Sequence, residues 1–342
     1  ISMGILHLQE RQRTALFVRH DDFGRFVSCL VFVPRDQYNT GIRLKVMEVL
    51  ADSLGGKVSA FSMEFTESPF ARLHVTITTP GGARSKIKSA AIEQKIADLA
   101  KSWPDHLGTE LTSAHGEDDG NQLRNIYNDA FPPSYRESFD AAAAVEDISR
   151  LEQVVAGEDL NLQLYRPANA AKNEVRFKVF HPHMPLPLSD VLPMLEDMGL
   201  RVIDEVPHAI RLDLETHQVI MIHDFGLVSR NGAAIDIEAV RQYFHEVFSR
   251  VWHGDMESDG FNALVLEAGL SWRQIVILRT YAKYLRQAKA PFSQDYMERT
   301  LANNPAITRN IVKFFETNFD PAAHKGRNRN IVRLRQKILD SL

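Results

Sequence analysis

Paired short strands, each pair followed by an amphipathic helix, limit the fold of this chain more than any other pattern. The clearest run, residues 26–33, is mostly β-branched or aromatic and ends at Pro34. Such a run is typical of a buried strand. Residues 15–18 form a second short apolar run, and the turn sequence Asp21-Asp22-Phe23-Gly24 lies between the two. The pattern therefore predicts a β-hairpin.

The hairpin is followed by a helix, two more strands and a second helix. Apolar residues at helical spacing predict the first helix, which Gly55-Gly56 ends. Residues 58–65 and 73–79 are predicted strands, and the second helix is expected to carry Ile92, Ile96, Leu99 and Trp103 on one face. The first hundred residues thus have the order ββαββα.

A second segment repeats this order in outline. Residues 175–180 alternate like a half-buried strand, and an apolar stripe then predicts a helix that ends at Gly199. Strands are predicted at 201–206 and 218–222, with a third piece at 210–214, and a closing helix follows. From Val175 the order is βαββα, with a sixth element to be added from the flanks. This is the order of a ferredoxin-like antiparallel sheet whose helices cover one face.

The remaining sequence is helical in character. We predict an α+β protein with four segments: a first module at 1–103, a helical linker at 104–158, a second module at 159–255 and an all-helical segment at 256–342. The last segment contains a capping box at residues 271–274 and a bulky apolar face that includes Phe314 and Phe315. A basic amphipathic helix near residues 331–339 has no stop signal, which predicts that the parent chain continues.

Composition excludes several classes of function. A formal net charge of -4 gives no electrostatic reason to expect nucleic acid or an anionic membrane as a partner. The single cysteine, Cys29, rules out an internal disulfide and suits a reducing compartment, so we expect the cytoplasm. No apolar run approaches the ~20 residues that a spanning helix needs.

Motifs for catalysis and cofactor binding are missing. The sequence contains neither G-x-G-x-x-G nor G-x-x-x-x-G-K-[ST], so we expect no nucleotide cofactor in this chain. His181-Pro182-His183 offers two imidazoles but no third ligand at a suitable spacing, and we expect no metal. Ser85 and Lys88 match a bare S-x-x-K, which a helix start explains better. We therefore assign no catalytic residue.

A basic stretch near the C-terminus leaves one alternative open. It consists of Lys325, Arg327, Arg329, Arg333, Arg335 and Lys337. A nucleic-acid-binding module would suit these charges, yet no aromatic lies among them to stack on bases. We favour the solvated face of a helix. A salt-dependent binding assay with generic DNA and RNA separates these hypotheses.

Three longer stretches resemble one known family. They are residues 25–40 (RFVSCLVFVPRDQYNT), residues 185–196 (PLPLSDVLPMLE) and the segment that runs from Ser258-Asp259-Gly260-Phe261-Asn262 to residues 281–287 (YAKYLRQ). They are similar to the N-terminal half of the large bacterial NAD-specific glutamate dehydrogenases. The resemblance implies that the chain holds the second and third ACT-like modules and a helical motif. It also implies a parent enzyme that oxidises L-glutamate with NAD to 2-oxoglutarate and ammonia, in a catalytic domain that lies beyond this chain.

The resemblance and the missing motifs together favour a regulatory and oligomerisation segment. Its expected partners are other domains and subunits of the parent, in a homo-oligomer, and an amino-acid effector. The effector loop is expected between the first strand and first helix of the second module, with His181, His183, Ser189 and Asp190 as its polar residues. Pro187 precedes the helix start, whose amides suit a carboxylate. The alternatives are a stand-alone amino-acid-binding module and a self-contained enzyme.

Overall fold

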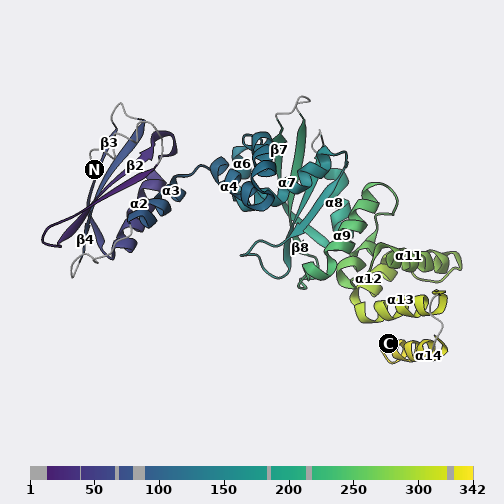
Figure 1. Cartoon of the computed structure of the whole chain (residues 1–342). Coiled ribbons are helices and arrows are strands. Elements are labelled where there is room, and N and C mark those ends of the chain that lie inside the picture. Colours follow the sequence, from purple (N-terminus) through teal and green to yellow (C-terminus); the bar gives the residue numbers. More distant parts are fainter. Residues whose placement is uncertain are drawn as a thin grey trace. The chain divides into compact units, whose positions relative to one another are not determined.

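The computed structural model describes residues 14–38, 40–65, 69–79, 89–182, 186–212, 218–321 and 327–341. The chain divides into two units, residues 1–124 and residues 125–342, and each is described by itself. Within the described residues the strands form two four-stranded antiparallel sheets, and helices make up most of the remainder (Figure 1). The predicted α+β class is confirmed.

The first unit contains the predicted ββαββα order. Its elements are β1 (Ala15–His20), β2 (Phe26–Pro34), the short 3-10 helix η1 (Arg35–Gln37), α2 (Thr40–Leu54), β3 (Lys57–Phe65), β4 (Phe70–Thr78) and α3 (Ser89–Ala100). Helices α4 (Trp103–His115) and α5 (Glu117–Tyr127) follow. The strand order in this sheet, sheet A, is β1-β2-β4-β3.

The core of sheet A lies on the face that α2 and α3 cover. Successive side chains of a strand point to opposite faces, so Val27, Cys29 and Val31 of β2 share the inner face and are buried. They pack with Leu50 of α2 and Ile96 of α3 in one apolar cluster. The hydrophobic periodicities of 2 and 3.6 residues therefore predicted this layer correctly.

The turn between α2 and β3 needs glycine for two different reasons. Gly55 has a φ of 63°, a left-handed conformation that ends the helix, and it has open space around it. Gly56 lies against β4, where an added Cβ would be 2.5 Å from the carbonyl oxygen of Thr78. The first glycine is required by the backbone and the second by packing.

The second unit repeats the topology. Helices α6 (Pro133–Ser138) and α7 (Ala141–Val155) precede β5 (Asn161–Tyr165), β6 (Glu174–Pro182), α8 (Leu188–Asp197), β7 (Leu200–Arg211), β8 (Val219–Ser229) and α9 (Ile237–Trp252). The order in this sheet, sheet B, is β5-β6-β8-β7, which matches sheet A strand for strand. The predicted sixth element is β5, and it comes from the N-terminal flank.

Two of the predicted boundaries that differ from the structure have a clear physical reason. The strand predicted at 201–206 and the start of the piece predicted at 210–214 belong to one strand, β7, which runs through Pro207 to Arg211; residues 213–217 lie outside the described residues. Proline is tolerated there because β7 is an edge strand. Trp103 does not lie on the face of α3: Ser102 and Asp105 form a capping box that starts α4 at Trp103.

The C-terminal helices are built onto the second module. They are η2 (Gly260–Ala263), α10 (Leu264–Glu267), α11 (Trp272–Gln287), α12 (Gln294–Asn303), α13 (Pro305–Phe319) and α14 (Arg327–Leu339). One apolar cluster runs from Phe177 in sheet B through Phe261 and Leu278 to Val312 in α13. Helix α14 lies beside α13 (Figure 1), and no described residue of α14 is fully buried.

The apolar face expected on α13 is only partly buried. Phe314 and Phe315 are both half-buried, and the Phe315 ring contacts Tyr281 edge-on with a centroid separation of 5.9 Å. The residues of α13 that are fully buried are Thr308 and Val312. None of the described helices combines the length and the apolar character that a membrane-spanning segment requires.

Candidate functional site

The predicted effector loop lies between β6 and α8. His181, near the end of β6, contacts Trp252 of α9 edge-on, with ring centroids 5.6 Å apart. Ser189 and Asp190 lie in the exposed first turn of α8, where the Ser189 hydroxyl donates to Asp190 Oδ1 at 3.2 Å. His183 lies outside the described residues. The structure thus brings Ser189 and Asp190 together and directs His181 towards α9.

A buried histidine on β8 fixes the end of this loop. The backbone N–H of Leu186 donates to Nε2 of His223 at 3.1 Å, so Nε2 must carry the lone pair. Nδ1 then carries the proton and donates to Glu205 Oε1 at 2.7 Å. His223 is not among the residues predicted from the sequence, because no motif surrounds it. Its position opposite Val179 in the central strand pair, facing α8, is visible only in the fold.

The outer face of sheet B, opposite α8 and α9, holds a second group of polar residues. Lys178 of β6 forms an ion pair with Asp147 of α7, with 2.5 Å between Nζ and Oδ2. The hydroxyl of Tyr135 donates to the same oxygen, also at 2.5 Å. The ring of Phe139 lies 3.8 Å from the Lys178 ammonium group and that of Tyr165 5.2 Å. Helices predicted to form a linker without chemistry therefore cover a buried charge pair.

Next to this pair, Arg176 holds two carboxylates. Its Nε donates to Asp224 Oδ2 at 2.9 Å, and its Nη2 donates to Asp204 Oδ1 at 3.0 Å. Asp204 reaches Arg176 across Gly226, where an added Cβ would be 2.7 Å from Asp204 Oδ1. Tyr165 also donates to Asp224 Oδ2, at 3.1 Å. The arrangement depends on a residue without a side chain at position 226.

A cavity of about 580 Å³ opens beside these residues. Its lining combines the polar groups of Tyr165, Arg176, His208 and Asp224 with apolar surface from Phe139, Ala143, Pro167, Ala168 and Val206. Burial raises the pKa of the Asp224 carboxyl. Burial lowers the pKa of His208 to about 4, so this imidazole is neutral at pH 7.

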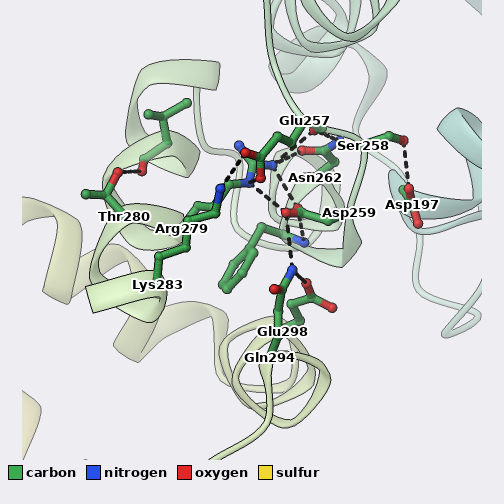
Figure 2. A network of polar contacts seen from close by, with 12 residues as sticks. Asp197, Glu257, Ser258, Asp259, Asn262, Arg279, Thr280, Lys283, Gln294 and Glu298 are labelled. Carbon is green, nitrogen blue, oxygen red and sulfur yellow. Dashed lines mark hydrogen bonds and ion pairs between the residues drawn. The ribbon is translucent and has the colours of Figure 1, made fainter. Parts of the chain in front are cut away.

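A third polar network holds the helical segment together (Figure 2). Arg279 of α11 makes a forked contact with Asp259, with Nε–Oδ2 and Nη2–Oδ1 both 2.8 Å. Its Nη2 also donates to Asn262 Oδ1 at 2.6 Å. The Ser258 hydroxyl donates to Asp197 Oδ2 at 2.7 Å and so ties the turn before η2 to the end of α8. No buried side-chain donor or acceptor of these described residues lacks a partner, which indicates a structural role.

Sheet A offers a smaller site. On its outer face Ser28 Oγ and His74 Nε2 are 2.7 Å apart, and Arg72 pairs with Glu64 at 3.2 Å, around a hollow of about 190 Å³. Among the described residues no group of three or more His, Cys, Asp or Glu side chains could hold a metal ion.

Comparison with known proteins divides the chain into four matched regions. Residues 15–104 match the glutamate dehydrogenase ACT2 domain and residues 159–240 its ACT3 domain. Residues 110–154 match helical motif 2 of glutamate dehydrogenase and residues 256–321 match helical motif 3. The two ACT matches coincide with the two sheets, and the resemblance drawn from the sequence is confirmed.

Three curated relatives share similarity over nearly the whole chain. An NAD-specific glutamate dehydrogenase of Halomonas elongata is 40% identical over 325 residues, or 95% of this chain. Those of Pseudomonas aeruginosa and Mycobacterium tuberculosis are 35% and 31% identical over 93% and 94% of it. In each case the chain spans only 20% of the length of the relative.

Proposed function

The chain belongs to the glutamate dehydrogenase family, as a segment with two ACT domains and two helical motifs, and we propose that it regulates and assembles a larger enzyme. That enzyme would oxidise L-glutamate with NAD in the cytoplasm, with its chemistry and its NAD site in other domains. We assign no catalytic residue and no cofactor to this segment. Its partners would be those other domains and further subunits, and neither nucleic acid nor a membrane.

The observation that carries the assembly role is the open edge of sheet A. Among the described strands β3 pairs with β4 alone, and every residue from Lys57 to Ser62 is exposed. Residues 58–63 contain no charge and no proline, and Phe61 is 49% exposed. An edge strand of this kind presents unpaired N–H and C=O groups to another strand.

Strand β7, at the equivalent edge of sheet B, is protected. It carries Pro207, which removes a donor, and the acidic pair Asp204 and Glu205. Proline and charge are devices that prevent edge-to-edge pairing, whereas a register shift occurs in both edge strands and does not distinguish them. The contrast supports β3 as the strand through which a second copy of the chain pairs.

Sedimentation analysis of the 342-residue chain tests this assembly role. We expect a dimer or larger oligomer, and a shift to monomer when Ala60→Lys and Ser62→Lys place two charges on the exposed strand. The matched control is Ile203→Lys, which adds a charge on β7, where the side chain is already 62% exposed. A wild-type chain that is monomeric at micromolar concentration would contradict assembly through β3, as would an unchanged oligomer in the double variant.

The loop from β6 to α8 supports a second role, the binding of an amino-acid effector. His223 holds Leu186, and Pro187, the N-cap residue, makes no side-chain cap to the first turn of α8. A carboxylate would fit these amides, with Ser189 and Asp190 as the nearest polar side chains, whereas His181 points towards α9 and His183 lies outside the described residues. A thermal-shift screen of the twenty amino acids tests this, since a ligand at 100 times its dissociation constant adds about 2.7 kcal/mol of stability. If none of the amino acids shifts the melting temperature, effector binding is contradicted and assembly remains as the proposed role.

A further inference from the structure

We propose that the cavity on the outer face of sheet B binds the protonated amino group of a small organic molecule, with Asp224 Oδ1 as its main acceptor. The site lies on the face of sheet B opposite the effector loop. Arg176, Lys178 and Asp224 point towards α6 and α7, whereas His181 and His223 point towards α8 and α9. The proposal therefore depends on neither the loop nor assembly through β3.

The two oxygens of the Asp224 carboxylate differ in their hydrogen bonds. Both side-chain donors that reach it, Arg176 Nε at 2.9 Å and Tyr165 Oη at 3.1 Å, bind the same oxygen, Oδ2. Oδ1 is buried, in a side chain that is only 4% exposed, and it has no hydrogen-bond partner within the described parts of the chain. A buried carboxylate oxygen without a donor is costly, so a donor from outside the chain would satisfy it.

His208 adds a second acceptor at the same cavity. Its ring is buried, its Nδ1 lies 3.4 Å from Ser134 Oγ, and its Nε2 finds no partner among the described residues. An ammonium group has three N–H donors and no acceptor, so it can serve Oδ1 and a neutral imidazole together. A carboxylate ligand would instead face Asp224 with like charge.

The charge balance favours a cation. Asp147 neutralises Lys178, and the guanidinium of Arg176 is shared between the two carboxylates Asp204 and Asp224. The cluster therefore carries one net negative charge before a ligand binds. Asp140, the N-cap of α7, adds a further carboxylate to the lining.

Size and lining indicate a small molecule with an apolar part. A volume of about 580 Å³ lies within the range of small-molecule sites, ~300–1,000 Å³. The wall opposite the polar groups consists of Phe139, Val206, Pro167 and Ala168. A short aliphatic amine or an α-amino acid would both present an ammonium group and apolar carbon to this cavity.

Calorimetric titration of the 342-residue chain tests the proposal with three ligands of one carbon skeleton. We expect n-butylammonium to bind at millimolar concentration and butyrate not to bind at the same ionic strength. L-2-aminobutyrate distinguishes the two sources: tighter binding than butylammonium would identify an amino acid, and weaker binding a simple amine. No heat from either ammonium ligand would overturn the proposal, and so would binding of butyrate as tight as that of butylammonium.

Three variants locate the site. Asp224→Asn should weaken butylammonium binding by at least about tenfold, because it removes the charged acceptor. Asp204→Asn is the matched control: it removes one negative charge from the same Arg176 but no acceptor from the cavity lining, so affinity should fall clearly less than in Asp224→Asn. Val206→Trp fills the cavity from an exposed strand position and should abolish binding while it leaves Asp224 in place. Binding that survives both Asp224→Asn and Val206→Trp would show that the ligand lies elsewhere.

Discussion

Lys178 and Asp147 form an ion pair in which the ammonium side chain is 3% exposed and the carboxylate is fully buried, with 2.5 Å between Nζ and Oδ2. The pair joins the central strand β6 to α7 and so fixes the helical layer on the outer face of sheet B. Two charges removed from water in this way are stable only because each satisfies the other.

Removal of one member of the pair should therefore cost more than removal of both. We expect Asp147→Leu alone to lower the free energy of unfolding by about 3–5 kcal/mol, because it leaves the Lys178 charge buried without a partner. The double variant Asp147→Leu, Lys178→Met should lose less. Urea unfolding of the three proteins measures the difference, and equal losses in the single and double variants would contradict a compensated pair.

Arg279 should not tolerate lysine. Its guanidinium contacts Asp259 through two parallel hydrogen bonds and also reaches Asn262, which a single ammonium group cannot reproduce. We expect Arg279→Lys to cost about 1–3 kcal/mol of unfolding free energy. Arg286→Lys on the same helix is the control, because Arg286 is exposed and bonds only to Gln294 in the described structure. Similar losses in both variants would show that the fork contributes nothing.

The adjacent glycines Gly55 and Gly56 should respond differently to alanine. Gly55→Ala strains a left-handed backbone but meets no neighbour, so it should cost about 1–2 kcal/mol. Gly56→Ala drives a methyl group into the backbone of β4, which cannot move without disturbing the sheet, and should cost about 1–3 kcal/mol or more. Chemical denaturation of unit 1 distinguishes them, and a larger loss for Gly55→Ala would contradict the packing role of Gly56.

Cys29 should react only when the first module unfolds. Its side chain is fully buried on the inner face of β2, and burial raises the pKa of the thiol to about 11. Since the thiolate is the reactive form, a disulfide reagent at pH 8 should label the native protein far more slowly than the urea-unfolded chain. Equal labelling rates in the two states would show that β2 is accessible in the native sheet.

The second unit should lose stability as the pH falls from about 6.5 to 4. His245 accepts a hydrogen bond from the Leu164 N–H, and burial lowers its pKa to about 4, below its value in the unfolded chain. Between these two values the unfolded state binds more protons, so unfolding becomes easier by up to about 1.4 kcal/mol per pH unit. The stabilising contribution is complete above pH 6.5.

His245→Gln provides the control for this pH dependence. Glutamine keeps an acceptor for the Leu164 N–H but does not titrate. Urea unfolding at pH 7 and pH 5 should show a smaller difference for His245→Gln than for the wild type. Identical differences would assign the acid sensitivity to other groups, of which His208 is the first candidate because burial also lowers its pKa to about 4.

Local periodicity predicted the elements of both modules because each strand and helix buries one face. It failed at two boundaries. The strand predicted at 201–206 ends before Pro207, because only the fold shows that β7 is an edge strand that tolerates proline. Trp103 was assigned to the preceding helix because the apolar stripe obscured the local capping box at Ser102. The polar face of β6 looked solvated, since nothing in its own sequence shows that α6 and α7 cover Arg176 and Lys178.

The candidate sites divide in the same way. The place of Ser189 and Asp190 at the start of a helix could be predicted, because the sequence itself shows the order strand, loop, helix. The side-chain partners of Asp224 are Tyr165 of β5 and Arg176 of β6, and its cavity also needs residues around α6 and α7. The residues that line this cavity have no regular spacing in the sequence, so no sequence pattern predicts the site.

The position of β1 and β5 at the N-terminal end of their modules affects how each sheet forms during synthesis. In a βαββαβ module the sheet stays incomplete until its last strand emerges, which exposes an open edge on the nascent chain. Here β1 and β5 are the first elements of their modules and not the last. Each sheet is therefore complete once β4 or β8 has left the ribosome. Only a helix, α3 or α9, then remains to cover the apolar face. A chain made from its N-terminus can therefore close each sheet before the next module is translated.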